Sequence, residues 1–362
     1  MLYLLLYPLH VDVSWFNLFR YVTFRAAYAA VTAFLIAFLL GRPLIRYLKK
    51  HMIKEIIREE VPERHRAKEG TPSMGGLLIL AAVLLPTALW ADISNAYVLV
   101  VLGVTAAMGL MGFYDDYLKL VRKKPLGLLA RWKFFGQAAL ALAIGLFVYL
   151  FPLDNGMTPV LTFPFIKNVA VNLGVFYVVF VAITIVGATN AVNLTDGLDG
   201  LAAGCMLFAA AAYAVMCYVV GNINFSKYLQ VMFVSGSAEL TVYMAAMAGA
   251  VLGFLWYNGF PAQVFMGDTG ALALGGGIGT VAVLIKQELL LVIVGGVFVA
   301  VTLSVIIQVL YFKITGGKRV FKMAPLHHHF ELGGMPEPRI VVRFWIISAI
   351  CAVLGLSTLK IR

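Results

Sequence analysis

Charged residues are scarce in this sequence: 12% of its 362 residues are charged, while 62% are hydrophobic and the mean hydropathy is +0.93. A soluble globular protein is about a quarter charged, so this composition excludes that class. The net charge of +11 would suit a nucleic-acid-binding protein. The basic residues, however, cluster between apolar runs, which is typical of membrane proteins. We therefore expect a multi-pass integral membrane protein that contacts membrane lipid and has no nucleic-acid partner.

Other features are also missing. The three cysteines, Cys205, Cys217 and Cys351, lie within apolar runs and form no C-x-x-C pair, which excludes a disulfide framework and a cysteine metal site. No Walker pattern G-x-x-x-x-G-K-[ST] occurs. The N-terminus has no basic region followed by a small-residue cleavage site, so we expect the first spanning helix to serve as an uncleaved insertion signal.

Long apolar stretches dominate what remains. A membrane-spanning helix needs about 20 mostly apolar residues. The sequence predicts an all-α protein with about ten such helices, at residues 21–45, 73–91, 96–114, 133–151, 172–189, 200–220, 237–256, 264–285, 288–311 and 340–359. Residues 1–20 contain Trp15, Phe16 and Phe19, which suit the headgroup region of a bilayer. We expect that segment to lie at the membrane interface.

The distribution of basic residues predicts the orientation. The loops after the first, third and ninth expected helices hold 19 of the 28 lysines and arginines, whereas the opposite loops hold only Lys167, Lys227 and Lys286. The positive-inside rule then places both termini in the periplasm. The cytoplasmic loops are about 46–72, 115–132, 190–199, 257–270 and 312–339. We expect one transmembrane domain over residues 1–362, in the cytoplasmic (inner) membrane of a bacterium.

The expected cytoplasmic loops carry most of the unusual polar groups. The third loop, Asn190–Gly200, reads N-A-V-N-L-T-D-G-L-D-G. Polar groups of this kind are expensive near a membrane and usually mark function. The second loop opens with F-Y-D-D-Y-L-K, the fourth contains F-M-G-D-T-G, and the fifth contains P-L-H-H-H-F-E-L-G-G-M-P-E-P-R. The sequence therefore predicts a single site on the cytoplasmic face.

The residue types in these loops suit phosphoryl transfer. A few carboxylates with room for water and phosphate describe a Mg²⁺ site, and the candidate ligands are Asp115, Asp116 and Asp268. Three lysines on the same face would neutralise a diphosphate: Lys68, Lys119 and Lys133. Gly197 and Gly200 would let backbone amides approach a ligand closely. The carboxamides and carboxylates around them could recognise ribose hydroxyls or a base edge.

Each feature also has a structural reading. An Asp-Asp pair at a helix end is often a solvated cap, Lys119 could be a positive-inside anchor, and a glycine-rich turn is weak evidence by itself. Three consecutive histidines, His327, His328 and His329, are unusual for a structural role, and histidines can act as neutral or cationic donors near phosphate. The joint occurrence of these groups on one membrane side favours an active site.

At these motifs the sequence resembles the polyprenyl-phosphate N-acetylhexosamine-1-phosphate transferases, of the glycosyltransferase family 4 type. The resemblance runs from T-F-R at Thr23 to the terminal L-K-I-R, and Asp115-Asp116, the Asn190–Gly200 loop and F-M-G-D are the shared motifs. The segment Pro325–Trp345 resembles the branch that uses a UDP-N-acetylmuramoyl-pentapeptide donor. A sister enzyme that uses UDP-N-acetylglucosamine is the main alternative, since only this segment argues against it.

The resemblance implies a Mg²⁺-dependent reaction. Undecaprenyl phosphate attacks the β-phosphorus of UDP-N-acetylmuramoyl-pentapeptide, lipid I forms and UMP leaves, in the first membrane step of peptidoglycan synthesis. The resemblance also implies a homodimer. A single in-line displacement and a covalent aspartyl-phosphate route both remain open.

The resemblance assigns roles residue by residue. The catalytic carboxylates would be Asp115, Asp116 and Asp268, with Asp268 as the principal metal ligand. The nucleoside pocket would comprise Lys68, Asn193, Asp196, Gly197, Leu198, Asp199 and Phe265, with Phe265 stacking on uracil. Asn258, Gln308 and His327–His329, above all His328, would line the phosphate and sugar side. Asn190, Lys119 and Lys133 complete the expected substrate contacts.

Two positions depart from the family pattern. Ala271 stands where the family usually has serine, and Val301 where it tends to have an acid.

Two other functions fit the sequence less well. An intramembrane aspartyl protease would need G-x-G-D, which is not the sequence before Asp268. A secondary transporter would need ionisable groups near the midplane, whereas here the acids lie at helix ends.

Overall fold

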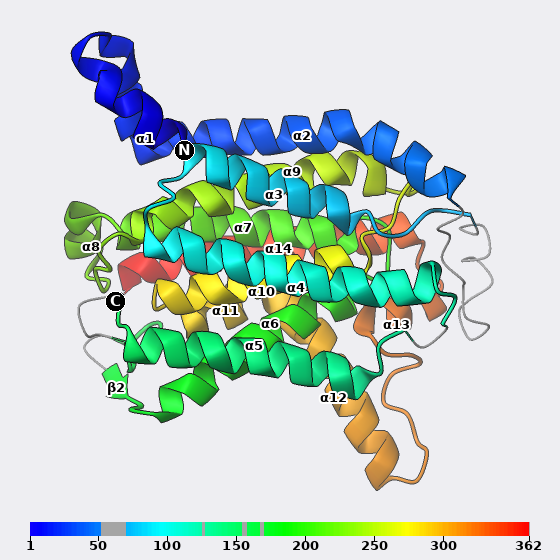
Figure 1. Ribbon diagram of the computed structural model, residues 1–362. Coiled ribbons are helices and arrows are strands. Elements are labelled where there is room, and N and C mark those ends of the chain that lie inside the picture. The colour runs from blue at the N-terminus through cyan, green and yellow to red at the C-terminus, as the bar shows by residue number, and fades with distance from the viewer. Residues whose placement is uncertain (52–69, 125–126, 154–157, 167–169, 362) are drawn as a thin grey trace.

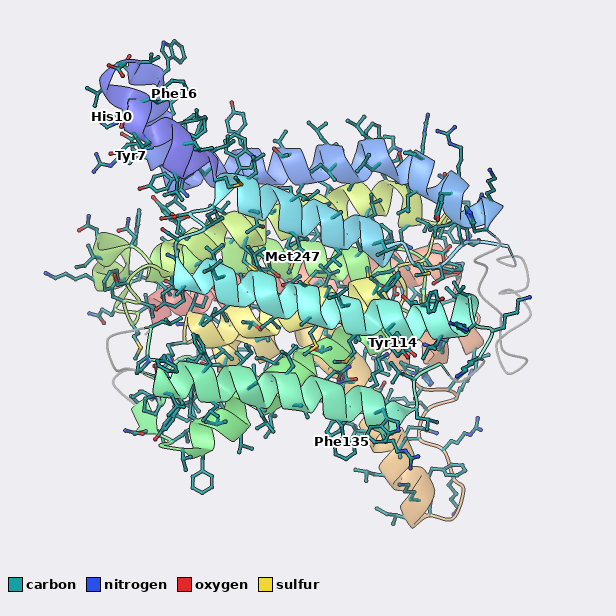
Figure 2. The ribbon with its side chains drawn as sticks, in the orientation of Figure 1. Tyr7, His10, Phe16, Tyr114, Phe135 and Met247 are labelled. Carbon is teal, nitrogen blue, oxygen red and sulfur yellow. The ribbon has the colours of Figure 1, made fainter. Side chains whose placement is uncertain are left out.

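The computed structural model describes residues 1–51, 70–124, 127–153, 158–166 and 170–361. It is a bundle of long helices that run side by side (Figure 1). The chain starts with α1 (Leu2–Leu6) and two 3₁₀ turns, η1 (Tyr7–Val11) and η2 (Ser14–Arg20). This N-terminal segment projects from one end of the bundle and carries Tyr7 and Phe16 (Figure 2).

Nine helices of the described chain are long and apolar enough to cross a membrane. They are α2 (Val22–Lys50), α4 (Ala96–Leu120), α5 (Ala130–Leu150), α6 (Phe176–Thr195), α7 (Leu201–Val220), α9 (Leu240–Asn258), α10 (Gly267–Leu284), α12 (Gly296–Ile314) and α14 (Glu337–Ile361). The apolar helix α3 (Gly76–Trp90) is shorter, at 15 residues. The predicted all-α, polytopic membrane architecture is confirmed.

Several of the ten expected spans differ from the prediction. Helices α4 and α6 continue to Leu120 and Thr195, so the beginnings of the loops expected at 115–132 and 190–199 are helical. Residues 73–75 precede α3 and pair through their backbone with the chain before α10: Gly75 N donates to Phe265 O at 2.8 Å. The expected span 288–311 is two helices, α11 (Glu288–Val294) and α12, separated at Gly295. Adjacent glycines are a common cause of helix breaks. Beyond that break, α12 extends away from the other helices (Figure 1).

The centre of the bundle is α10, which is packed against α4 and α6. Every residue from Thr269 to Leu284 is buried. Its glycines at 275, 276, 277 and 279 allow close approach, as small residues do in membrane helix packing. The helices α2 and α7 both pack on α9, and α14 packs on α7. The start of α10 is in close contact with α4 at Gly112 and with α3 at Gly76.

The two chain ends lie at the same end of the bundle (Figure 1). That end also holds α8 (Ile223–Leu229) and an antiparallel hairpin of β1 (Val160–Thr162) and β2 (Ala170–Asn172), with Leu161 opposite Val171. Tyr114, next to the predicted Asp pair, lies at the other end (Figure 2). The sequence likewise predicts that the two termini lie on one side of the membrane and the site on the other. The periplasmic placement of the termini stays a prediction.

A buried ion pair ties α2 to the start of α9 at the end that carries the termini. The Arg25 guanidinium, 2% exposed, donates two 2.6 Å hydrogen bonds to the Glu239 carboxylate. The backbone amide of Asp92 also donates to Glu239, at 3.0 Å. Such a bidentate pair is geometrically specific, and removing one partner strands a buried charge.

We expect Glu239→Leu to lower the thermal midpoint of the detergent-solubilised protein, by the equivalent of about 3–5 kcal/mol, because Arg25 would remain buried and unpaired. The double variant Arg25→Met with Glu239→Leu should recover most of that loss. A thermal unfolding curve by intrinsic fluorescence measures both. A double variant as unstable as the single one would show that the charge itself is not what destabilises.

Candidate active site

The carboxylate of Asp116 accepts three hydrogen bonds from the beginning of α10. The donors are Asp268 N at 3.1 Å, Thr269 N at 2.9 Å and Thr269 Oγ1 at 2.6 Å. Helix N-termini have backbone amides without intrahelical acceptors and a positive end of the helix dipole. Asp116, 4% exposed, therefore caps α10 from the neighbouring helix α4 and positions Asp268.

Two glycines permit this contact. Gly267 has φ +72°, and a Cβ there would lie 2.8 Å from Asp116 Oδ2. A side chain on Gly112, one turn before Asp116, would collide with the backbone of Asp268. Glycine is therefore required at both positions for α4 and α10 to meet this closely.

Asp115 and Asp268 share two lysine ammonium groups. Lys119 Nζ lies 2.9 Å from Asp115 Oδ2 and 2.7 Å from Asp268 Oδ2. Lys133 Nζ, from the start of α5, lies 3.3 Å from Asp115 Oδ2 and 2.8 Å from Asp268 Oδ2. We call these four residues the charged quartet. Its groups come from three helices, so it exists only when α4, α5 and α10 meet.

The charged quartet is formally neutral, because two carboxylates face two ammonium groups. Asp115 is 1% exposed, and a buried carboxylate is tolerated only when paired and hydrogen-bonded. Leu128 N supplies a further hydrogen bond to Asp115 Oδ1 at 2.7 Å. The Lys119 side chain is 35% exposed, so the quartet is open to ligands on that side.

The end of α6 contributes two carboxamides. Asn193 Nδ2 donates to Asp268 Oδ1 at 2.6 Å, which joins Asn193 to the charged quartet. Asn190, one turn earlier, donates instead to Gln137 Oε1 at 2.7 Å and to Val186 O at 2.9 Å. Of the two predicted asparagines, the structure places Asn193 directly against a site carboxylate.

The segment before α3 reaches the same region through its backbone. Phe265 N donates to Pro72 O at 2.9 Å, and Gly76 N donates to Met266 O at 2.7 Å. Phe265, the predicted uracil-stacking residue, is half-buried. Lys68, predicted to bind substrate, lies outside the described residues, and its role stays a prediction.

The loop after α6 is held by polar groups that sequence analysis assigns to substrate. Asp199 Oδ2 accepts from Ala262 N at 2.9 Å. Asn258 accepts from Gly200 N at 3.1 Å and donates to Val264 O at 2.9 Å. Asn258 and Asp199, both 3% exposed, thus connect this loop to the chain before α10. Leu198 is buried, and Asp196 and Gly197 are half-buried.

The three histidines begin α13 (Leu326–Leu332) and have different surroundings. His327 is buried, and a side chain on Gly197 would collide with its imidazole. His328 Nδ1 lies 3.0 Å from Glu331 Oε2. His329 Nδ1 accepts from Lys322 N at 3.1 Å. His327 therefore brings α13 against the predicted nucleoside loop.

Gln308 has a different neighbourhood. Its Oε1 accepts from Val320 N at 3.1 Å and Phe321 N at 2.9 Å, which folds the loop after α12 back on that helix. Ala271 and Val301, the two departures from the family pattern, are both fully buried. Both side chains are apolar, so neither supplies the polar group that the family pattern has at its position.

The donor set fits a magnesium ion better than a transition metal. Within the described residues, no three His, Cys, Asp or Glu side chains are close enough to share one metal ion. Mg²⁺ typically uses one or two carboxylates and completes its shell with water and phosphate oxygens. Asp115 and Asp268 already share cations, whereas Asp116 is occupied by the start of α10. The available pair is thus Asp115 and Asp268.

Sequence analysis missed several residues of this region. Glu337 Oε1 accepts from Asp199 N at 2.8 Å, and Trp345 Nε1 donates to Gly200 O at 3.2 Å. Both lie in the Pro325–Trp345 segment, so polarity within that motif was an available signal. Gln137 was also missed, although it is a carboxamide within an apolar span and one turn from Lys133.

The site lies within a recognised family region. Residues 98–286 match the family described as glycosyl transferase family 4, over just over half of the chain. This region contains the charged quartet, Asp116 and Asn193. Residues 68–80 match phospho-N-acetylmuramoyl-pentapeptide-transferase signature 1. The fold and the site thus define a membrane-embedded glycosyl transferase of family 4.

Full-length relatives narrow the assignment. The chain is 55% identical to the phospho-N-acetylmuramoyl-pentapeptide-transferase of Desulfosudis oleivorans, 53% to that of Citrifermentans bemidjiense and 55% to that of Pelobacter propionicus. Each match spans 362 residues and all of both chains. The chain belongs to the phospho-N-acetylmuramoyl-pentapeptide-transferase family.

We expect Asp116→Asn to lower both stability and activity. The amide would turn one donor toward the amides of α10, so the thermal midpoint should fall by the equivalent of about 1–3 kcal/mol. Activity should fall because Asp268 is displaced. Tyr114→Phe, at an exposed neighbouring position, is the control and should change neither property. An Asp116→Asn protein with unchanged thermal midpoint would argue against the capping role.

Proposed function

We propose that this protein transfers phospho-N-acetylmuramoyl-pentapeptide from UDP-N-acetylmuramoyl-pentapeptide to undecaprenyl phosphate. The products are lipid I and UMP, in the first membrane step of peptidoglycan synthesis. The full-length identity to transferases of that name supports this donor over UDP-N-acetylglucosamine. The observation that carries the chemistry is the charged quartet, which gathers carboxylates and ammonium groups at one end of the bundle.

The reaction exchanges one phosphate–oxygen bond for another. An oxygen of the lipid phosphate forms a bond to the β-phosphorus of the donor, and the bond from that phosphorus to the bridging oxygen breaks. UMP leaves with that oxygen. A phosphate monoester has a second pKa of about 6, so the lipid phosphate is largely a dianion at neutral pH. A strong general base is therefore unnecessary, and a direct in-line displacement accounts for the chemistry.

Charge balance supports a role for the two lysines in holding the diphosphate. In the charged quartet, Lys119 and Lys133 are paired with carboxylates. A divalent cation on the carboxylates would free both ammonium groups for the diphosphate oxygens, and the site would stay nearly neutral. Charge-assisted hydrogen bonds from ammonium to phosphate are stronger than neutral ones. The lysines would thus orient the donor and stabilise charge on the departing UMP.

Magnesium is part of the proposal. Asp268 and Asp115 would hold the ion, and bound Mg²⁺ would supply electrostatic stabilisation of the phosphate oxygens. Asn193, hydrogen-bonded to Asp268 Oδ1, fixes the orientation of that carboxylate. Asp115 faces the lysines, so it is better placed than Asp116 to position the lipid phosphate. Asp116 would support catalysis by holding α10.

The site should face the cytoplasm of a bacterium, in the inner membrane, because the loops that form it contain most of the lysines and arginines, which favour the cytoplasmic side. The phosphate of the lipid substrate would then approach from the same membrane surface. A homodimer is proposed from the family resemblance alone.

The first test is UMP release by the detergent-solubilised protein with undecaprenyl phosphate and Mg²⁺. We expect release with UDP-N-acetylmuramoyl-pentapeptide, none with UDP-N-acetylglucosamine, and loss of release with EDTA. Release with UDP-N-acetylglucosamine alone would overturn the donor assignment. UMP exchange into the donor without lipid acceptor would overturn the direct displacement and favour a covalent intermediate.

Asp268→Asn should abolish turnover, by about a thousandfold or more, since several kcal/mol of charge stabilisation at the phosphate is lost. The thermal midpoint should change little, because the amide keeps the shape and can still accept from Asn193. Asp12→Asn, an exposed aspartate at the opposite end, is the matched control. Near-normal UMP release by Asp268→Asn would remove this residue from the reaction.

A further inference from the structure

Helix α5 contacts the bundle along one narrow stripe. Its buried residues are Gln137, Ala141, Gly145 and Val148, spaced three or four positions apart. Residues at that spacing lie on one face of a helix. Lys133 is four positions before Gln137 and continues the stripe to the charged quartet. The rest of α5 faces outward: Phe135 is 62% exposed and points away from the bundle (Figure 2).

The partner of the stripe is α6. Gly145 lies against the backbone of Val178, and Gln137 Oε1 accepts from Asn190 Nδ2 at 2.7 Å. Lys133 and Asn193 both reach Asp268. These three contacts follow one antiparallel register, in which residue numbers rise along α5 as they fall along α6. The Gln137–Asn190 bond is a side-chain hydrogen bond that joins the two stripes directly.

Small residues such as Ala141 and Gly145 let two helices approach closely, but they supply no polar pairing of their own. A single buried polar pair is a well-attested way to specify register. In the α5 stripe, Ala141 and Gly145 are small residues, and Gln137 is the buried polar residue. The Gln137 side chain is 0% exposed, so solvent cannot replace its partner.

The orientation of this pair is determined by the structure. Asn190 Nδ2 also donates to Val186 O at 2.9 Å, so its amino group must face Gln137 Oε1. Gln137 Nε2 then has no acceptor among the described residues. A buried donor without a partner is costly, so an apolar residue at 137 would serve stability at least as well. Stability alone does not explain glutamine at this position.

We propose that Gln137 is a positioning residue, whose hydrogen bond to Asn190 sets the register of α5 on α6 and thereby places the Lys133 ammonium on Asp115 and Asp268. This gives Asn190 a role in the same pair rather than in direct contact with substrate. The placement of Lys133 follows from these contacts, and its consequence for turnover rests on the proposed function.

The test compares Gln137→Met with Val148→Ala. Methionine keeps the volume but removes the hydrogen bond, while Val148→Ala loosens the same stripe at its far end. The probe is an amine-acylating reagent, and the rate of acetylation at Lys133 is measured by mass spectrometry, with the exposed Lys227 as internal reference. We expect Gln137→Met to raise the Lys133 rate several-fold with little change in thermal midpoint. Val148→Ala should lower the midpoint and leave the Lys133 rate unchanged.

Kinetics give a second, independent comparison. Gln137→Met should lower kcat for UMP release by about 10- to 100-fold, as displaced catalytic groups do. In a Lys133→Ala background the same substitution should have less than a twofold further effect. The swapped pair, Gln137→Asn with Asn190→Gln, retains a carboxamide pair and should restore the Lys133 labelling rate.

An unchanged Lys133 labelling rate in Gln137→Met would overturn the proposal, as would an equal rise in Val148→Ala, which would indicate general loosening of α5. If labelling changes as expected but no variant and no wild-type protein releases UMP, the positioning role stands and the proposed function fails. If the wild-type protein releases UMP and Gln137→Met is equally active, the positioning role has no consequence for catalysis and the proposal fails.

Discussion

The site depends on the contact between the Asp116 carboxylate and the first amides of α10. Asp268 is the second residue of α10, so its direction is set by how α10 begins. The amides of a helix N-terminus need acceptors, and a carboxylate also interacts favourably with the helix dipole. Because Asp116 lies beside Asp115 on α4, the same contact brings the two carboxylates of the charged quartet together.

The other helices extend this arrangement. Helix α5 brings Lys133, α6 brings Asn193, and the segment before α3 pairs with the chain before α10. Each polar group is placed at a helix end, where it can be paired or face water. The bundle interior consists mainly of small and apolar residues, with a few buried polar side chains such as Gln137, and its packing holds the helix ends in register.

Several predicted substrate contacts have structural partners as well. Asn258 and Asp199 join the loop after α6 to the chain before α10, and Glu337 joins it to α14. These bonds explain why polar residues gather in a loop that a ligand would approach. A preorganised loop pays less conformational entropy when a ligand binds. The same segment can therefore be supported by these hydrogen bonds and still recognise a nucleoside.

Hydropathy and charge predict the helical membrane architecture well, because a bilayer demands long apolar helices and biases basic residues to one side. The adjacent glycines at 295 and 296 were a local signal for the break between α11 and α12. The shortened start of α3 could not be predicted, because it depends on contacts with a distant segment. For the same reason the sequence treats Asp115 and Asp116 as equivalent. Their adjacent positions point in different directions on α4, and only one direction meets α10.

The sequence by itself determined the class of protein, the helix content and the residue types at the site. Those follow from local composition, periodicity and motifs. Only the tertiary structure decided which carboxylates share the lysines, which one caps α10, and that Gln137 pairs with Asn190. The Gln137–Asn190 and Asp116–Thr269 pairings join residues 53 and 153 positions apart. They depend on helix register and on the absence of side chains at Gly112 and Gly267, which no local pattern specifies.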